Sequence, residues 1–325
     1  MKNMFRFLIL MLSVVMFSTG FAQSNKRIDS LLLMLQEVNS DTSKILTYHD
    51  LHKEYVRLDS VQAIRYLDLA FKLSEKTKSK MHLCQTYLLL CNFRWKKGNL
   101  NTAKKALAAA ENLLKHIKND KLEATYFIEH GLVAYYDGSY AIAVENFLLG
   151  VEKYKVLKDN TGESKCYSNI GICYMELENM DKALEYYLKA EKVLVAPEDN
   201  KTLSGIWGNI GIIYKNKEAY GKALEYYKKS LQVNQKLGMK WDEAINLQNI
   251  GALYEKSGEF SKSLNYFKDA KKLCEQINDK IGILYADHGT ASTLIQLGKF
   301  SEGITLLNTS LLFAEELEVN HELRD

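Results

Sequence analysis

The stretch Tyr167-Ser-Asn-Ile-Gly171-Ile-Cys-Tyr174 decides the fold, because it returns twice at intervals of 40 residues. The later copies are Trp207-Gly-Asn-Ile-Gly211-Ile-Ile-Tyr214 and Leu247-Gln-Asn-Ile-Gly251-Ala-Leu-Tyr254. A second stretch recurs with the same period, as Lys182-Ala-Leu-Glu-Tyr-Tyr187, Lys222-Ala-Leu-Glu-Tyr-Tyr227 and Lys262-Ser-Leu-Asn-Tyr-Phe267. Self-similarity with a period between about 20 and 50 residues indicates stacked structural repeats.

The same period extends over residues 41–320 when the chain is divided into blocks of 40 that begin at Asp41. Position 23 of each block is small: Ala63, Ala103, Ala143, Ala183, Ala223, Ser263 and Gly303. Position 30 is also small: Ala70, Ala110, Gly150, Ala190, Ser230, Ala270 and Ser310. Position 27 is always large and apolar: Leu67, Leu107, Phe147, Tyr187, Tyr227, Phe267 and Leu307. These positions share one stripe of a helix, so we expect a second helix to approach closely at the small residues.

Each block is predicted to hold two amphipathic helices joined by a short turn. In the first helix, positions 7, 10, 11 and 14 form the stripe expected to be buried, as in Tyr167, Ile170, Gly171 and Tyr174. The turn is expected near positions 17–19, where Gly98, Gly138, Gly258 and Gly298 stand, because glycine permits the backbone conformation that ends a helix. The chain has one proline, Pro197, which favours helix nearly throughout. The predicted fold class is all-α.

The order Ile-Gly-x-x-Tyr, then Ala-x-x-x-Tyr or Phe, then a small residue three positions on, resembles the tetratricopeptide repeat. HEAT repeats share the 40-residue period, but this spacing favours the tetratricopeptide pattern, in a variant six residues longer than the usual 34. The resemblance implies a helix-turn-helix solenoid, a superhelix of seven repeats after a leading helix within residues 23–40. The predicted repeats are residues 41–80, 81–120, 121–160, 161–200, 201–240, 241–280 and 281–320, and 321–325 would begin an incomplete eighth.

Residues 1–22 have the composition of a secretory signal peptide. Lys2 and Arg6 precede an apolar stretch over residues 7–17, and small residues lead to a cleavage site near Ala22. An uncleaved membrane anchor is the alternative, but that stretch is short beside the roughly 20 residues of a membrane span. We therefore expect an exported chain, periplasmic or secreted, with no membrane span after cleavage.

Charge and cysteine content argue against several classes of protein. Removal of Lys2 and Arg6 from 43 basic residues leaves 41 against 40 acidic ones, a net charge of +1 that does not suit nucleic acid as a partner. The cysteines are odd in number, so they cannot form a closed disulfide framework and are interpreted as core residues: Cys84, Cys91, Cys166, Cys173 and Cys274. His49 and His52 lack a convincing third metal ligand. Gly205-x-x-Gly208-x-x-Gly211 falls inside a predicted helix and not in a nucleotide loop. The sequence predicts no enzyme, metal or cofactor.

A binding face is predicted on the first helices, opposite the stripe expected to be buried. Position 9 holds Asn169, Asn209 and Asn249, whose amides could pair with the backbone of an extended peptide. Position 12 places apolar residues beside them: Leu132, Ile172, Ile212 and Ala252. Repeat solenoids use their concave face for such binding, and in some tetratricopeptide proteins an asparagine here contacts bound peptide. The other interpretation also stands, in which the asparagines bond to a neighbouring repeat and the apolar row packs between helices.

Further residues extend this face. Lys215 and Lys256 could meet a carboxylate, or could simply be solvated. Tyr135 and Tyr136 could lengthen the groove, although one of them is expected to be core.

At the other end, the predicted last helix over residues 300–318 keeps Ile304, Leu307 and Leu311, which another helix would normally cover. Self-association or a partner is expected to cap it. The array also resembles the periplasmic repeat regions of bacterial sensor histidine kinases and helix-turn-helix regulators. Two functions follow: an exported protein- or peptide-binding scaffold, or the signal-input region of a regulatory system, truncated or acting with a separate output partner.

Overall fold

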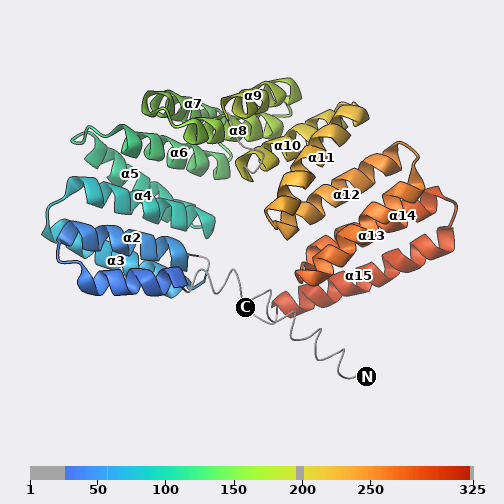
Figure 1. The fold of residues 1–325 in the computed structure, drawn as a ribbon, viewed down its shortest axis with the longest axis horizontal. Helices are drawn as coiled ribbons and strands as arrows, with labels where there is room; N and C mark the ends of the chain where they lie inside the picture. Colours follow the sequence, from blue (N-terminus) through green and yellow to red (C-terminus); the bar gives the residue numbers. More distant parts are fainter. Residues whose placement is uncertain (1–25, 57, 195–200, 323–325) are drawn as a thin grey trace. The chain divides into compact units, whose positions relative to one another are not determined.

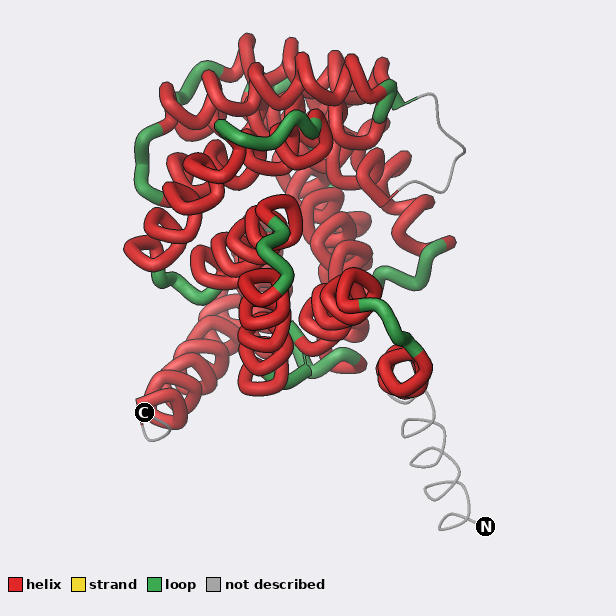
Figure 2. The backbone as a smooth tube through the Cα atoms, turned by 90° about the vertical axis from the view of Figure 1, so that its left-hand side faces the viewer, coloured by secondary structure: helices red, strands yellow, loops and turns green. Residues whose placement is uncertain are grey.

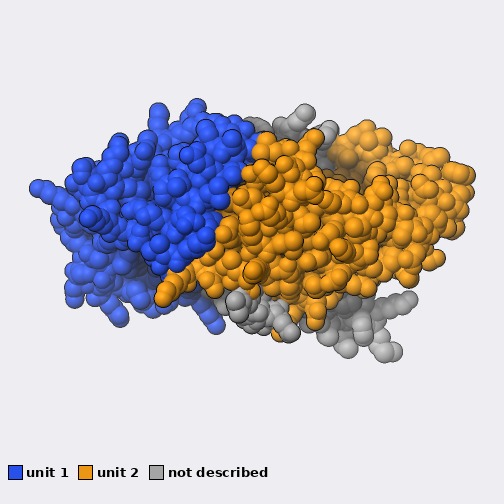
Figure 3. Space-filling model, turned by 90° about the horizontal axis from the view of Figure 1, so that it is seen from above, with its two compact units in different colours: residues 1–157 blue, residues 158–325 orange. Residues whose placement is uncertain are grey.

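The computed structural model describes residues 26–56, 58–194 and 201–322, with side chains to residue 315, and every regular element in these ranges is a helix (Figures 1 and 2). The predicted signal peptide lies outside the described residues. Residues 26–37 are helical, and fourteen labelled helices follow. The chain divides into two compact units, residues 1–157 and 158–325 (Figure 3). The all-α prediction is confirmed.

The helices follow one another in packed pairs within each compact unit. The first unit holds α2 (Asp41–Tyr55), α3 (Ser60–Lys76), α4 (Lys80–Lys96), α5 (Leu100–Leu114), α6 (Asp120–Tyr136) and α7 (Tyr140–Leu157). The second holds α8 (Asn160–Glu176), α9 (Met180–Val193), α10 (Lys201–Asn216), α11 (Tyr220–Lys236), α12 (Lys240–Lys256), α13 (Phe260–Gln276), α14 (Lys280–Gln296) and α15 (Phe300–Glu322). Even-numbered helices are the first of each pair.

Helix ends are set by local chemistry. Asp59 begins α3 by accepting hydrogen bonds from the backbone N–H groups of Val61 and Gln62, and other Asp and Asn residues cap later helices in the same way. Gly98, Gly138, Gly258 and Gly298 have φ between 74° and 77°, the left-handed conformation that ends a helix. These four glycines therefore lie at the turns where the sequence predicts them, in the conformation that glycine adopts most readily.

The small-large-small stripe forms the contact within each pair. In α9, Ala183, Tyr187 and Ala190 are fully buried. The ring of Tyr187 lies over Gly171 of α8, where an added Cβ would come within 2.9 Å of the ring. Glycine in the first helix thus allows an aromatic ring of the second helix to pack against its backbone.

The buried stripe predicted for the first helix is confirmed at Ile170 and Gly171, which are buried in α8, and wrong at its two ends. Cys166 and Cys173 are fully buried, whereas Tyr167 and Tyr174 are only half-buried. Within the second unit, α10 and α12 show one reason, because each packs on the second helix of the preceding pair as well as on its own partner. In α10, Leu203, Ile206, Ile210 and Ile213 share one core cluster with α9, the second helix of the preceding pair.

The cysteines and histidines considered for chemistry are core residues. All five cysteines are free and buried. His49 and His52 are buried in α2, where the Nε2 atom of His49 lies 2.7 Å from Oγ1 of Thr86 and Nδ1 of His52 lies 2.9 Å from the carbonyl oxygen of Ala63. Gly205, Gly208 and Gly211 lie inside α10.

Helix α15 leaves apolar side chains in contact with solvent. Ile304 and Leu311 expose 52% and 58% of their surface, and Leu307 is half-buried. None of the helices in the described ranges is long and apolar enough to cross a membrane.

Candidate functional site

Three asparagines occupy the same position of successive first helices in the second compact unit. Asn169 lies on α8, Asn209 on α10 and Asn249 on α12, and each is half-buried. Among the residues that the structure describes, no hydrogen bond links these amides to another group. A half-buried amide without a protein partner retains its donors and its acceptor for water or for a ligand.

A groove of about 420 Å³ lies between α8 and α10 and includes Asn209. Its other lining residues are Lys165, Ser168, Lys201, Thr202, Gly205 and Ile206. Gly205 is exposed, and a Cβ added there would meet nothing within 4 Å, so the floor of the groove is open beside the asparagine. Lys165 and Lys201 were missed in the sequence, although they lie four and eight residues before block position 9, on the same helical face.

The apolar row takes part in packing between helices. Ile172 is half-buried against the cluster that α9 and α10 share, and Ile212 is half-buried against the cluster of α11 and α12. Each side chain therefore packs against the next pair of helices, and only part of its surface remains exposed beside the asparagines. Leu132 is half-buried on α6, in the first compact unit.

Lys215 and Lys256 form a positively charged end to this face. Burial lowers the pKa of Lys215, and the nearby charge of Lys256 lowers it further. Lys256 itself is exposed at the end of α12. A bound carboxylate would therefore stabilise the ammonium groups of half-buried Lys215 and exposed Lys256, which repel each other.

The first compact unit has a second groove, of about 430 Å³, mainly between α4 and α6. Glu129 lies there at block position 9, where the next three repeats carry asparagine, and it is only 6% exposed. Its two carboxylate oxygens accept hydrogen bonds from Nδ2 of Asn92 and Nε1 of Trp95, both at 2.8 Å. Burial raises the pKa of this carboxyl, and the two hydrogen bonds oppose that rise. Sequence reasoning missed Glu129, although its place in the repeat could have revealed it.

The two tyrosines predicted to lengthen the binding face differ in exposure. Tyr136 is 53% exposed and stacks on Trp95, with ring centroids 4.9 Å apart, while Tyr135 is half-buried. Over the described ranges, no three His, Cys, Asp or Glu side chains come together as metal ligands.

Sequence comparison identifies the repeats. Family models described as tetratricopeptide repeat match residues 164–193 and 202–276. Among curated protein sequences, none matches this chain significantly.

Solved structures resemble this chain in fold. The apo form of RapI has a TM-score of 0.72 at 14% identity, covering 85% of this chain and 77% of RapI. A Rap protein complexed with Competence and Sporulation Factor has a TM-score of 0.62 at 13% identity, covering 91% and 94%. The quorum sensor NprR from B. thuringiensis, in its apo form, has a TM-score of 0.61 at 19% identity, covering 84% and 76%. NprR in complex with its cognate peptide NprX has a TM-score of 0.53 at 20% identity, covering 81% and 76%.

The recurring glycine-aromatic contacts, the paired helices and the family matches lead to one assignment. This chain carries tetratricopeptide repeats, which family models match over residues 164–193 and 202–276.

Proposed function

We propose that this protein is a non-enzymatic scaffold that binds an extended segment of a partner protein along the first helices of its second compact unit. The observation that supports this proposal most directly is the row of half-buried side-chain amides at Asn169, Asn209 and Asn249, which have no hydrogen-bond partner among the described residues. Side-chain amides can donate to and accept from the backbone of an extended peptide without depending on its sequence.

The charges beside this row favour an acidic segment. Lys165 and Lys201 line the groove at Asn209, and Lys215 and Lys256 stand together at the far ends of α10 and α12. A carboxylate near Lys215 would offset both its desolvation and its repulsion from Lys256. The ligand that fits best is therefore a peptide whose backbone amides pair with the asparagines and whose acidic side chains pair with the lysines.

Structures of the same fold support this proposal. Two similar structures are a Rap protein complexed with Competence and Sporulation Factor and NprR in complex with its cognate peptide NprX. At 13% and 20% identity these structures share the fold with this chain. The proposal for this chain depends on its own asparagines and lysines.

The proposed place of action is the periplasm, or outside the cell after secretion. The support is the basic start at Lys2 and Arg6 followed by the apolar stretch that ends before Ala22. Expression of the full chain in a bacterial host, followed by separation of periplasm and cytoplasm, tests this placement. A shortened chain beginning near Gln23 should appear in the periplasm, and a full-length chain retained in the cytoplasm would refute export.

A signal-input role is the second candidate function. The observation that favours it is the exposed apolar surface of α15, where Ile304 and Leu311 are available for an output partner. Sedimentation of the purified chain distinguishes self-association from a free surface. If the wild-type chain is a dimer and the substitutions Ile304→Glu and Leu311→Glu convert it to a monomer, a second copy covers this surface. If the wild-type chain is a monomer, the surface remains available to a different protein.

Peptide selection tests the scaffold proposal. Random peptides displayed on phage are selected on the full chain, and one peptide is measured by fluorescence anisotropy against a variant with Asn169, Asn209 and Asn249 changed to alanine. We expect the affinity to fall at least tenfold, because each lost hydrogen bond contributes about 0.5–1.5 kcal/mol. The matched control changes three exposed asparagines on second helices, Asn101, Asn265 and Asn308, and should bind as wild type. Equal affinity of both triple variants, with helical content intact, would refute the site.

A further inference from the structure

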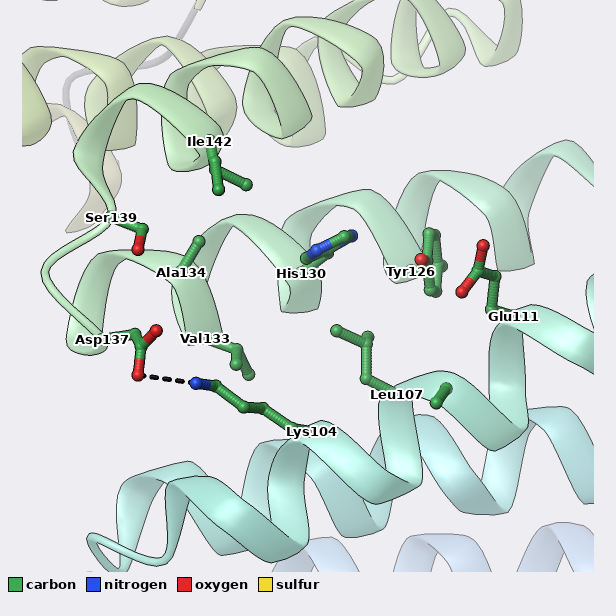
Figure 4. A pocket seen from close by; sticks show the side chains of 11 residues that line it. Lys104, Leu107, Glu111, Tyr126, His130, Val133, Ala134, Asp137, Ser139 and Ile142 are labelled. Atoms are coloured by element: carbon green, nitrogen blue, oxygen red, sulfur yellow. Dashed lines mark hydrogen bonds and ion pairs between the residues drawn. The ribbon is translucent and has the colours of Figure 1, made fainter.

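A separate pocket of about 310 Å³ lies in the first compact unit, on a different side of α6 from the groove at Glu129. Figure 4 shows side chains of α5, α6 and the start of α7 converging on it. Leu107, Val133, Ala134 and Ile142 supply apolar walls, and Glu111, Tyr126 and His130 stand toward one end. This volume lies at the small end of the range for ligand pockets, which is about 300–1,000 Å³.

The pocket exists because this repeat lacks a tyrosine pair that later repeats have. Stacked rings occur at Tyr174–Tyr186, Tyr214–Tyr226 and Tyr254–Tyr266. Tyr214 packs against the core cluster of α9 and α10. The residue 80 positions before Tyr214 is Ala134, and the one 80 before Tyr226 is Asn146. Ala134 therefore leaves open the space that an aromatic ring fills in the fifth repeat.

A second replacement removes a lysine from the same place. In the fifth repeat, the ammonium of Lys222 lies 5.2 Å from the centroid of the Tyr214 ring. The residue 80 positions before Lys222 is Ile142, which lines the pocket. Thus both the ring and the cation above it are absent from the third repeat, and an apolar wall stands in their place.

Glu111, an exposed carboxylate at the edge of the pocket, contributes a negative charge that no described side chain pairs with. Glu191 occupies the same repeat position 80 residues later, and it accepts a hydrogen bond from Nε1 of Trp207 at 2.7 Å. Lys271 occupies that position after another 80 residues, and its Nζ lies 2.7 Å from Oδ1 of Asp287. In both repeats the partner lies 16 residues further along the chain. The residue 16 positions after Glu111 is Phe127, which cannot pair with a carboxylate. Within the described ranges, the Glu111 side chain has no hydrogen bond or ion pair.

The other charges at the pocket do not neutralise Glu111. Lys104 and Asp137 form an ion pair with each other at 2.6 Å, shown at the opposite end in Figure 4. Burial lowers the pKa of His130, against the opposing influence of Glu111 and Glu145, so this imidazole favours its neutral form. Burial and then the Glu111 charge raise the pKa of Tyr126 to about 12, which keeps the phenol neutral. The net charge facing the cavity is therefore that of Glu111.

We propose that this pocket binds a small aromatic molecule that carries a protonated amine, an arylalkylamine. The ring takes the place of the missing tyrosine ring between Leu107, Val133 and Ala134, and the ammonium group pairs with Glu111. Burial of the ring supplies affinity, and the carboxylate selects a cation over a neutral or anionic molecule of the same shape.

The probe for this site is 2-phenylethylamine, titrated into the full chain and followed by calorimetry and by NMR of the alanine and isoleucine methyl groups. A molecule with nine non-hydrogen atoms should bind with a dissociation constant of about a millimolar. We expect 2-phenylethanol to bind more weakly and phenylacetate not to bind detectably. The shifted methyl signals should include those of Ala134 and Ile142.

Variants test the two parts of the site separately. Glu111→Gln should weaken binding of the amine by about two- to fivefold without changing the affinity for 2-phenylethanol. Ala134→Tyr should abolish binding by filling the cavity, and Ala134→Leu, a smaller replacement, should weaken it if the tyrosine does not fold. Glu152→Gln, an exposed carboxylate of α7, is the charge control and should bind as wild type.

The proposal would be overturned by the absence of saturable binding by the amine at tens of millimolar, by equal affinity of Glu111→Gln and wild type for the amine, or by binding of phenylacetate as tightly as 2-phenylethylamine. Methyl shifts confined to residues outside the pocket would also overturn it.

Discussion

A Cβ placed on Gly211 would lie 2.6 Å from the ring of Tyr227, closer than a Cβ and an aromatic carbon approach in real proteins. Gly211 is in the first helix of its pair and Tyr227 in the second. The same relationship joins Gly171 to Tyr187, and Gly131 to Phe147 in the first compact unit. One contact between a glycine and a ring therefore sets how closely the paired helices approach in successive repeats.

Gly211→Ala should destabilise the protein, because overpacking forces the Tyr227 ring or the helix to move at a cost of about 1–3 kcal/mol. This loss exceeds the gain of about 0.8–1.0 kcal/mol that alanine brings to a helix interior. Gly205→Ala is the matched control on the same helix, where an added Cβ meets nothing within 4 Å. It should be neutral or stabilising. Urea unfolding of both variants measures the difference, and equal stabilities would contradict the contact.

The repeat and its close contacts could be predicted from the sequence, because residues such as Ala183, Tyr187 and Ala190 recur at a spacing that only one helical face explains. The burial of Ile206 in place of Trp207 could not. A period shows which residues share a face, but the first helix packs on two neighbours, and the second neighbour widens and rotates the buried surface. A single repeat does not contain that information.

The candidate site was predicted in part. The asparagine row follows directly from the period, and Asn209 does line a groove. Glu129 and Ala134 differ from the residues that the next repeats carry at the same positions, so the period alone does not point to the groove and the pocket that they line. Such departures become interpretable only when the contacts of the regular positions, such as Tyr214 against Tyr226, are known.

Glu218→Gly should stabilise the protein by about 0.5–1 kcal/mol. Glu218 has φ of 57°, at the turn position where other repeats have glycine, and a side chain in this conformation is strained. Glycine removes that strain but adds freedom to the unfolded chain, which offsets part of the gain. Thermal unfolding gives the comparison, with Gly258→Ala, at the same turn position of the next repeat, expected to destabilise. A lower unfolding temperature for Glu218→Gly would contradict this account.

Stability should fall as the pH is lowered from 7 to 5. Burial lowers the pKa of His49 to about 3 from 6.5, so below pH 6.5 the unfolded chain takes up a proton that the folded chain does not. The contribution is present in full above pH 6.5 and is lost toward pH 3, at up to about 1.4 kcal/mol per pH unit. Burial of His52 acts in the same direction.

Urea unfolding at several pH values measures this slope. His49→Asn, which cannot take up the proton, should reduce the slope even though the loss of the contact with Thr86 lowers stability at pH 7. Identical slopes for the variant and the wild type would refute the role of His49.

The most direct measurement of the binding proposal is photo-crosslinking at two matched positions. Gly205 on α10 lines the groove beside Asn209, and Gly221 on α11 is exposed; an added Cβ meets nothing within 4 Å at either glycine. The photoreactive residue p-benzoylphenylalanine replaces one glycine at a time, and each variant is irradiated with the selected peptide. We predict a covalent adduct from position 205 and none from position 221. An adduct from position 221 alone would place the peptide on the second helices and contradict the account.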